Sequence, residues 1–243
     1  MIGALLAGGG AAGPAPSDVM LNPLASADTR ERLRGQLAGL ERPVWLRVFT
    51  QPGDDEQMRV AALRLAQGVA DLSDTVYAEP LRLPDDEGRF QALAIERTPA
   101  IAVIGEGDTD YGIRFYGVPG GGELKSLVAA VRLVASGDPV LSDASREALA
   151  TLDRRVTIEV FATLGCTFCP DAVQMAHRLA LASDKVTAAM VEVSAFPQYA
   201  KERGVSAVPK VVVNGEACFE GRRSEEEFVA AVLACAMRDE RAR

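Results

Sequence analysis

This 243-residue chain repeats one order of predicted elements in its two halves, and the repeat restricts the fold more than any single motif does. Each half starts with an amphipathic helix and continues into an apolar strand, at residues 44–50 in the first half and 156–162 in the second. In the first of these helices, Asp28 and Glu31 resemble a capping box. A long helix follows each strand, so the two halves are interpreted as two copies of one unit.

The later parts of the two units match as well. Pro99 follows Phe49 by 50 residues, and Pro209 follows Phe161 by 48. Each proline precedes an apolar strand, a glycine turn, another strand and a closing helix. With one further short strand in each unit, the order α-β-α-β-α-β-β-α predicts an α/β fold, in which each unit is a mixed β-sheet flanked by helices. The further strands are expected near residues 76–83 and 186–193.

The boundary between the units is predicted near Gly137 and Pro139, which end one helix before the next begins. We therefore expect a disordered tail at residues 1–27, a first domain at 28–137 and a second at 138–243. Domains of this length are common.

The tail carries Gly8, Gly10 and Gly13, which have the spacing of a dinucleotide-binding turn. Such a turn follows a strand and opens a helix, whereas here no strand precedes it and prolines follow, so we interpret the match as compositional. The tail also lacks the basic start of a secretory signal, and Met20 is an alternative first residue.

Composition argues against several classes of function. A net charge of −8 disfavours broad binding to nucleic acids or anionic membranes, because both surfaces would repel the protein. No stretch approaches the ~18 consecutive apolar residues of a membrane-spanning helix. The four cysteines are too few for the disulfide framework of a small secreted domain, so we expect a reducing, cytoplasmic location.

Two of the four cysteines, Cys166 and Cys169, form a CxxC motif between the strand 156–162 and the helix that follows. This places the motif at a helix amino terminus, where unpaired N–H groups and the helix dipole stabilise a thiolate. Cysteines in this setting have pKa values lowered to about 3.5–7.5. The spacing also brings the two Cα atoms to roughly 5–6 Å, which suits a disulfide.

The pattern predicts thiol-disulfide exchange in two steps. Cys166, nearer to solvent, would attack a substrate disulfide, and the buried Cys169 would then resolve the mixed disulfide. Thr167 and Phe168 lie between the thiols and help to set the reduction potential.

The sequence Cys-Thr-Phe-Cys-Pro after a strand, with Val208-Pro209 about forty residues later, resembles the thioredoxin/glutaredoxin superfamily. The duplicated layout resembles the glutaredoxin-like protein disulfide oxidoreductases, which consist of two tandem thioredoxin folds, and more distantly the amino-terminal module of flavoprotein alkyl hydroperoxide reductases. Residues 28–235 carry the likeness. Its most telling segments are YGIRFYGVPGGGELKSLV, DAVQMAHRLA and YAKERGVSAVPKVVVNGE.

The resemblance implies roles for two further residues. Val208 would offer backbone hydrogen bonds to an extended substrate segment. Pro209 would follow a cis peptide bond and, lacking an N–H, would leave the face of the sulfur open. A cis bond before proline costs only about 0.5–1 kcal/mol, which packing can supply.

The chain departs from the family in its first unit, where residues 54–57 (DDEQ) occupy the place of the thiols although Thr98-Pro99 is retained. We expect this domain to be redox-silent and to serve structure or partner docking. In the second unit, the position at which thioredoxins bury an aspartate is Val160. Its neighbour Glu159 is expected to face the other side of the sheet, which argues against a proton-relay role.

The remaining candidates have plain structural interpretations. Cys218 and Cys235 do not begin helices, so we expect core thiols instead of a second redox pair. His177, the only histidine, is two turns beyond Cys169 and is expected to be packed or half-exposed. Lys210 either adds positive charge near the thiolate or is solvated. One cysteine pair does not make a structural zinc site.

The sequence therefore predicts a protein disulfide oxidoreductase with no bound cofactor or metal, acting on protein disulfides and dithiols. The resemblance implies a flavoprotein of the thioredoxin reductase type as electron donor. One alternative is an electron shuttle dedicated to a peroxiredoxin. Others are a non-catalytic adaptor and a protein that binds an iron–sulfur cluster through Cys166 of two subunits.

Overall fold

The computed structural model describes residues 24–238, and the order of elements predicted for each unit is confirmed. The predictions for the tail before residue 24 lie outside the described residues. The first unit consists of α2 Ala27–Leu37, β1 Val44–Thr50, α3 Glu56–Ala70, β2 Val76–Arg82, α4 Glu87–Ala92, β3 Ala100–Ile104, β4 Asp110–Tyr116 and α5 Leu124–Ser136. The second consists of α6 Asp143–Ala150, β5 Val156–Ala162, α7 Cys169–Ala182, β6 Val186–Glu192, α8 Pro197–Glu202, β7 Lys210–Val213, β8 Glu216–Glu220 and α9 Glu225–Arg238.

The start of the first unit differs from the prediction in one detail. Ser26 precedes α2, and its side-chain oxygen accepts a hydrogen bond from the backbone N–H of Thr29. The predicted capping box of Asp28 and Glu31 is therefore wrong, because a serine two residues earlier satisfies the free N–H group. Leu24 is buried against the core, so the described chain is already packed before residue 28.

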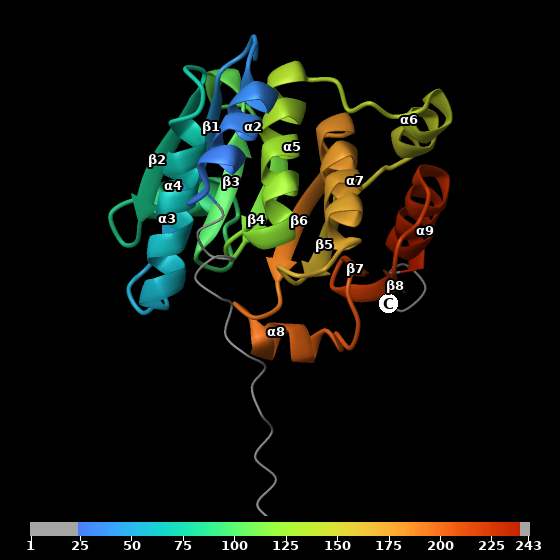
Figure 1. The fold of residues 1–243 in the computed structure, drawn as a ribbon. Helices are drawn as coiled ribbons and strands as arrows, with labels where there is room; N and C mark the ends of the chain where they lie inside the picture. Colours follow the sequence, from blue (N-terminus) through green and yellow to red (C-terminus); the bar gives the residue numbers. More distant parts are fainter. Residues whose placement is uncertain (1–23, 239–243) are drawn as a thin grey trace, which may run out of the picture.

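The two units share one sheet. Its eight strands lie in the order β2-β1-β3-β4-β6-β5-β7-β8, and the units meet where β4 pairs with β6 in parallel. Ile113 is aligned with Ala188 at one end of this pairing, and Tyr116 with Val191 at the other. Figure 1 shows the strands of the second unit continuing the sheet of the first. Without this pairing, β4 and β6 would each be an edge strand with unpaired backbone N–H and C=O groups.

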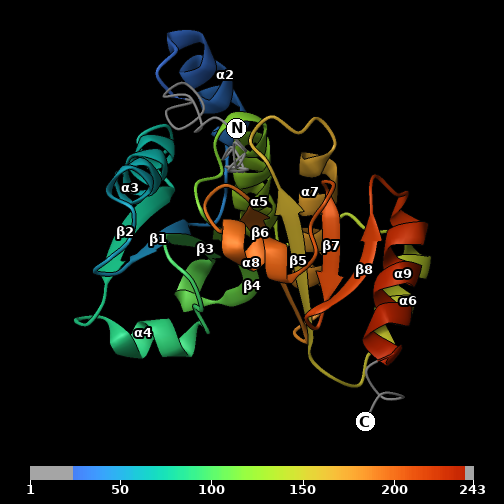
Figure 2. The ribbon, with the colours of Figure 1, turned by 90° about the horizontal axis from the view of Figure 1, so that it is seen from below.

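Helices cover both faces of the sheet, as Figures 1 and 2 show, with α3, α5 and α7 on one face and α4 and α8 on the other. Strand alternation separates the two apolar cores. In β5, Ile158 and Val160 pack in the core beneath α7, whereas Phe161 packs with α8. None of the helices within residues 24–238 combines the length and apolar character needed to cross a bilayer.

Candidate active site

The CxxC pair lies between the end of β5 and the start of α7, as predicted. We call residues 163–168 the redox loop. Its turn is closed by the N–H of Cys166, which donates to the carbonyl of Thr163 at 3.1 Å. Cys166 and Cys169 form a disulfide with their Cα atoms 5.5 Å apart, and Cys169 is the first residue of α7. The backbone therefore holds the two sulfurs at bonding distance.

The two sulfurs differ in exposure. Cys169 is fully buried, whereas Cys166 is half-buried and is flanked by the exposed Thr167 and by Phe168, a residue that is 52% exposed. An incoming sulfur nucleophile or a substrate disulfide can therefore reach Cys166 but not Cys169. This asymmetry agrees with the predicted order of attack and resolution.

The start of α7 favours negative charge on Cys166. The N–H of Cys169 points at the Cys166 sulfur, with 3.1 Å between nitrogen and Sγ, and the amino-terminal end of the helix dipole adds to this. Asp171 in the first turn would oppose a thiolate. Its carboxylate is paired with the Nε of Arg222 at 3.1 Å, which reduces its repulsion.

Pro209 directly precedes β7, as the sequence predicts. The Val208–Pro209 peptide bond is cis, Pro209 is buried, and Val208 packs half-buried against the core that contains Cys169. The carbonyl of Pro209 accepts the N–H of Gly221 at 2.8 Å, which ties it to the end of β8. The Thr98–Pro99 bond of the first unit is also cis.

In the first unit, hydrogen-bonded carboxylates occupy the position that corresponds to the thiols. Asp54 stands where Cys166 does in the second unit. One carboxylate oxygen accepts the hydroxyl of Thr98 at 2.5 Å, and the other accepts the N–H of Gln51 at 2.8 Å. Asp55 caps α3 by accepting the N–H of Met58. This loop is thus stabilised by carboxylates and contains no redox-active group.

Glu123 is a residue beside the site that the sequence did not reveal. It is fully buried just before α5, and one carboxylate oxygen accepts the Ser126 hydroxyl at 2.6 Å. The other carboxylate oxygen has no hydrogen-bond partner among residues 24–238. Burial raises the pKa of Glu123 from 4.5 to about 7, against the opposing effect of the Ser126 hydrogen bond.

Glu123 belongs to the first unit but lies close to the redox loop of the second. The preceding residue, Gly122, donates its N–H to the carbonyl of Leu164 at 2.9 Å. A Cβ at Gly122 would be 3.9 Å from the ring of Pro170, next to Cys169. The only signal in the sequence is an acidic residue after a glycine run, which does not indicate burial beside another domain.

The other ionisable candidates do not reach the thiols. Glu159 faces the α8 side, as predicted, and accepts the Tyr199 hydroxyl at 2.6 Å. Lys210 is buried, donates to the carbonyl of Gly204 at 2.7 Å and pairs with Glu220 at 3.4 Å, so the solvated interpretation of this residue is wrong.

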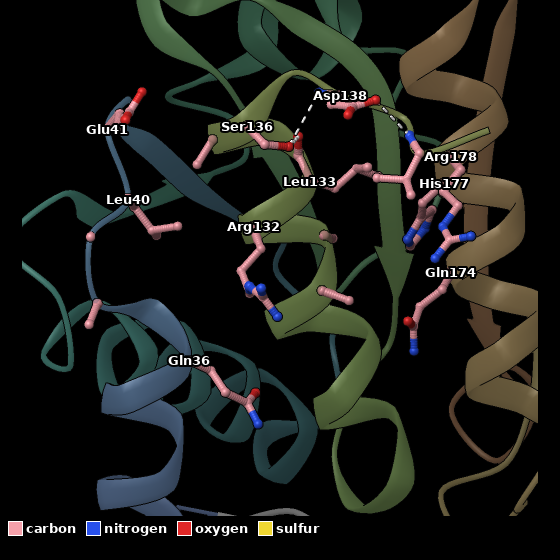
Figure 3. Close-up of a pocket in the computed structure, with 16 residues that line it drawn as sticks. Gln36, Leu40, Glu41, Arg132, Leu133, Ser136, Asp138, Gln174, His177 and Arg178 are labelled. Carbon is pink, nitrogen blue, oxygen red and sulfur yellow. Dashed lines mark hydrogen bonds between the residues drawn. The ribbon is translucent and has the colours of Figure 1, made fainter. Parts of the chain in front are cut away.

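His177 is buried on α7, and burial lowers its pKa to about 3. It lines a hollow of about 670 Å³ between α2, α5 and α7. Figure 3 shows Arg132 and Leu133 contributing to this hollow from α5, and Arg178 from α7. Neither cysteine of the redox pair lines it. His177 is therefore a packed residue, and the hollow is separate from the redox site.

The prediction that Cys218 and Cys235 are free core thiols is wrong. They form a second disulfide between β8 and the last turns of α9, with Cα atoms 5.9 Å apart. Sequence spacing did not reveal this pairing, because the cysteines are 17 residues apart and become neighbours only when α9 packs back on the edge strand. The bond ties the final helix to the sheet.

We expect the double substitution Cys218→Ser, Cys235→Ser to lower the free energy of unfolding by about 3 kcal/mol, because the bond closes a short loop in the unfolded chain. Urea unfolding of oxidised wild type and variant measures the difference. Treatment with reductant should lower the stability of the wild type by more than that of the double variant, which retains only the Cys166–Cys169 disulfide. Equal stabilities under oxidising conditions would contradict the prediction.

Comparisons with known proteins agree with this geometry. A family model described as a thioredoxin domain matches residues 156–234. A solved protein disulfide oxidoreductase from Aeropyrum pernix has a TM-score of 0.79 and 30% identity, covering 87% of this chain and 94% of that one. The solved NTD_N/C domain of alkylhydroperoxide reductase AhpF from Enterococcus faecalis has a TM-score of 0.79 and 28% identity, covering 85% and 99%.

Curated relatives extend beyond this chain. The F component of alkyl hydroperoxide reductase from Pseudomonas aeruginosa is 26% identical over 210 residues, which is 86% of this chain and 37% of that protein. A protein of Ferdinandcohnia aciditolerans named NADH dehydrogenase is 32% identical over 136 residues, which is 56% of this chain and 26% of that protein. The chain thus spans between about a quarter and somewhat over a third of these relatives.

Proposed function

Because the chain belongs to the protein disulfide oxidoreductases of the thioredoxin superfamily, and is itself a thiol-disulfide oxidoreductase with a Cys166/Cys169 pair, we propose that Cys166 is the attacking thiol and Cys169 the resolving one. The observation that carries this assignment is the difference in exposure: Cys166 is half-buried and receives the Cys169 N–H on its sulfur, whereas Cys169 is fully buried.

In the reducing direction, the Cys166 thiolate attacks one sulfur of a substrate disulfide and releases the other substrate sulfur as a thiolate. Cys169 then loses its proton and attacks Cys166, which forms the internal disulfide and releases the second substrate thiol. Two electrons pass to the substrate. A dithiol or flavoprotein reductant restores the reduced pair, and the same steps in reverse oxidise a dithiol.

We assign substrate contact to Thr167, Phe168, Val208 and Pro209. Thr167 and Phe168 are exposed beside Cys166, and Pro209 has no N–H to compete for the sulfur. For Val208, the proposed contact is backbone pairing with an extended segment of the substrate.

Glu123 is proposed as the group that receives the proton of Cys169. A buried thiol needs a nearby base in order to attack, and a carboxyl with a pKa of about 7 exchanges protons readily at neutral pH. The position of Glu123, directly after the glycine that bonds to Leu164, supports this role.

The chain would exchange electrons with a flavoprotein of the thioredoxin reductase type and with a peroxiredoxin. Support comes from relatives named as the F component of alkyl hydroperoxide reductase and from the 99% coverage of the solved NTD_N/C domain of such a protein. Stopped-flow mixing of the reduced protein with an oxidised peroxiredoxin tests this second role. A rate no greater than that of a monothiol would reject it.

Cys169→Ser should trap the mixed disulfide, because Cys166 can still attack but nothing buried can resolve the product. We expect a covalent complex with insulin or another disulfide protein, visible by non-reducing electrophoresis and released by dithiothreitol. The control is Cys166→Ser with Cys169 intact, which should form no complex. A complex with that control instead would reverse the two roles.

A further inference from the structure

The redox-silent first unit reaches the redox loop through its glycine loop, which we define as residues 120–123. Gly122 donates to the Leu164 carbonyl, and a Cβ placed on Gly121 would lie 2.5 Å from that same oxygen. A Cβ on Gly122 would lie 3.4 Å from the carbonyl oxygen of Cys166. The two loops are therefore in backbone-to-backbone contact, with no room for a side chain at Gly121.

Strand direction explains why these loops meet. β4 runs parallel to β6, and β6 runs parallel to β5, so all three strands end at the same edge of the sheet. The chain leaving β4 crosses the end of β6 at Gly117, where a Cβ would lie 2.8 Å from the Cβ of Glu192. It then arrives at the redox loop, which follows β5.

The repeat provides an internal comparison. Gly117 and Gly221 are equivalent, since each donates its N–H at 2.8 Å to the carbonyl of the cis proline in its own unit, Pro99 or Pro209. A Cβ on Gly221 would meet no described residue within 4 Å. The close approach thus comes from the way the units pair and is not a property of the repeated fold.

The glycine loop holds the part of the redox loop that sets the position of the nucleophile. Leu164 lies inside the turn closed by the Thr163 carbonyl and the Cys166 N–H. The Cys166 sulfur in turn receives the N–H of Cys169 at 3.1 Å. A shift of Leu164 would therefore move the sulfur relative to the helix amide that stabilises its thiolate.

We infer that the first unit positions the nucleophile of the second, with Gly121 and Gly122 acting as positioning residues for Cys166. This inference rests on the proposed function, in which Cys166 attacks the substrate. It gives the redox-silent unit a role in catalysis that requires neither thiols nor partner docking.

The test compares Gly121→Ala with Gly107→Ala. Both glycines have left-handed backbones, with φ of +51° at Gly121 and +64° at Gly107, so alanine meets a similar backbone penalty at each. A Cβ at Gly107 would have nothing within 4 Å among the described residues, whereas at Gly121 it would press on the Leu164 carbonyl. The pair separates displacement of the redox loop from backbone strain.

Three measurements are made on the reduced full chain: insulin reduction, the pH dependence of Cys166 alkylation, and hydrogen exchange of the Cys166 amide. Gly121→Ala should reduce insulin about tenfold to a hundredfold more slowly, since small misplacements of reacting groups have effects of this size. Its alkylation midpoint should rise and its Cys166 amide should exchange faster. Gly107→Ala should match the wild type within about twofold, because it leaves the reacting groups in place.

If Gly121→Ala behaves as Gly107→Ala does in all three measurements, the inference is overturned. Should Gly121→Ala fail to fold, Gly122→Val replaces it. A Cβ at Gly122 would already be in contact with the carbonyl oxygens of Cys166 and Leu164, both at 3.4 Å, so the two additional methyl groups press on the redox loop. No difference between that variant and Gly107→Ala in alkylation or amide exchange would then overturn it. Failure of the proposed function looks different, since wild type and Gly107→Ala would both leave insulin unreduced.

Discussion

Cys166→Ser is expected to reduce insulin no faster than dithiothreitol does alone. A serine hydroxyl does not ionise at neutral pH, so the helix amides at the start of α7 have no anion to stabilise, and no covalent intermediate forms. The measurement is insulin precipitation at fixed dithiothreitol with increasing protein. We expect a slope for the wild type and none for the variant.

Asp54→Asn supplies the matched control. Asp54 stands at the equivalent place in the first unit. Asparagine can still accept the Thr98 hydroxyl through its amide oxygen and loses only the acceptor for the Gln51 N–H. This variant should keep the activity of the wild type. Loss of activity in Asp54→Asn together with full activity in Cys166→Ser would place the thiol-disulfide exchange in the first unit and contradict the prediction.

Glu123→Gln is expected to change both turnover and stability, each in a way that depends on pH. Glutamine cannot accept a proton, so resolution by Cys169 should slow by about 10²-fold at neutral pH. In the wild type the rate should rise as pH passes through about 7, where Glu123 loses its proton. The rate of the variant should lack this step.

The stability of the wild type changes with pH in the opposite direction to its rate: it falls as pH rises. The folded protein holds the Glu123 proton up to about pH 7, whereas the unfolded chain releases it near 4.5. The contribution of Glu123 to the free energy of unfolding is therefore complete below pH 4.5 and is lost as pH rises through 7. A shift of this size corresponds to about 3 kcal/mol, because each pH unit is worth about 1.4 kcal/mol.

Urea unfolding of both proteins between pH 4.5 and 8 measures this difference. The wild type should lose about 3 kcal/mol more than Glu123→Gln over that range. Ser126→Ala is a further check, since removal of the hydrogen bond that lowers the Glu123 pKa should move the midpoint of activity to higher pH. Parallel curves of stability against pH for wild type and Glu123→Gln would contradict the effect of burial on the Glu123 pKa. Parallel curves of rate against pH would contradict the proposed proton transfer.

Much of the fold and of the redox site follows from local patterns. The order of elements in each unit depends on short-range periodicity and on turn residues, and both can be read along the chain. The CxxC pair is also local, since four consecutive residues and the helix that follows fix the sulfur separation and the surrounding amides. The redox silence of the first unit is equally local, because residues 54–57 hold carboxylates and an amide where thiols would be needed.

Other features depend on contacts between segments that are distant in the sequence. The sequence predicted a sheet for each unit, but backbone edges carry no side-chain signature, so the parallel pairing of β4 with β6 was not predictable. The same holds for the disulfide between Cys218 and Cys235, whose partners meet only when α9 packs on β8.

The sequence by itself determined two copies of one α/β unit and which copy carries the thiols, because these depend on residue order and spacing. Only the tertiary structure decided that the copies share one sheet, and that the loop after β4 reaches the loop after β5. That contact buries Glu123 beside the redox loop and leaves no space for a side chain at Gly121. Its physical origin is the common direction of three adjacent strands, which brings their carboxyl ends to one edge.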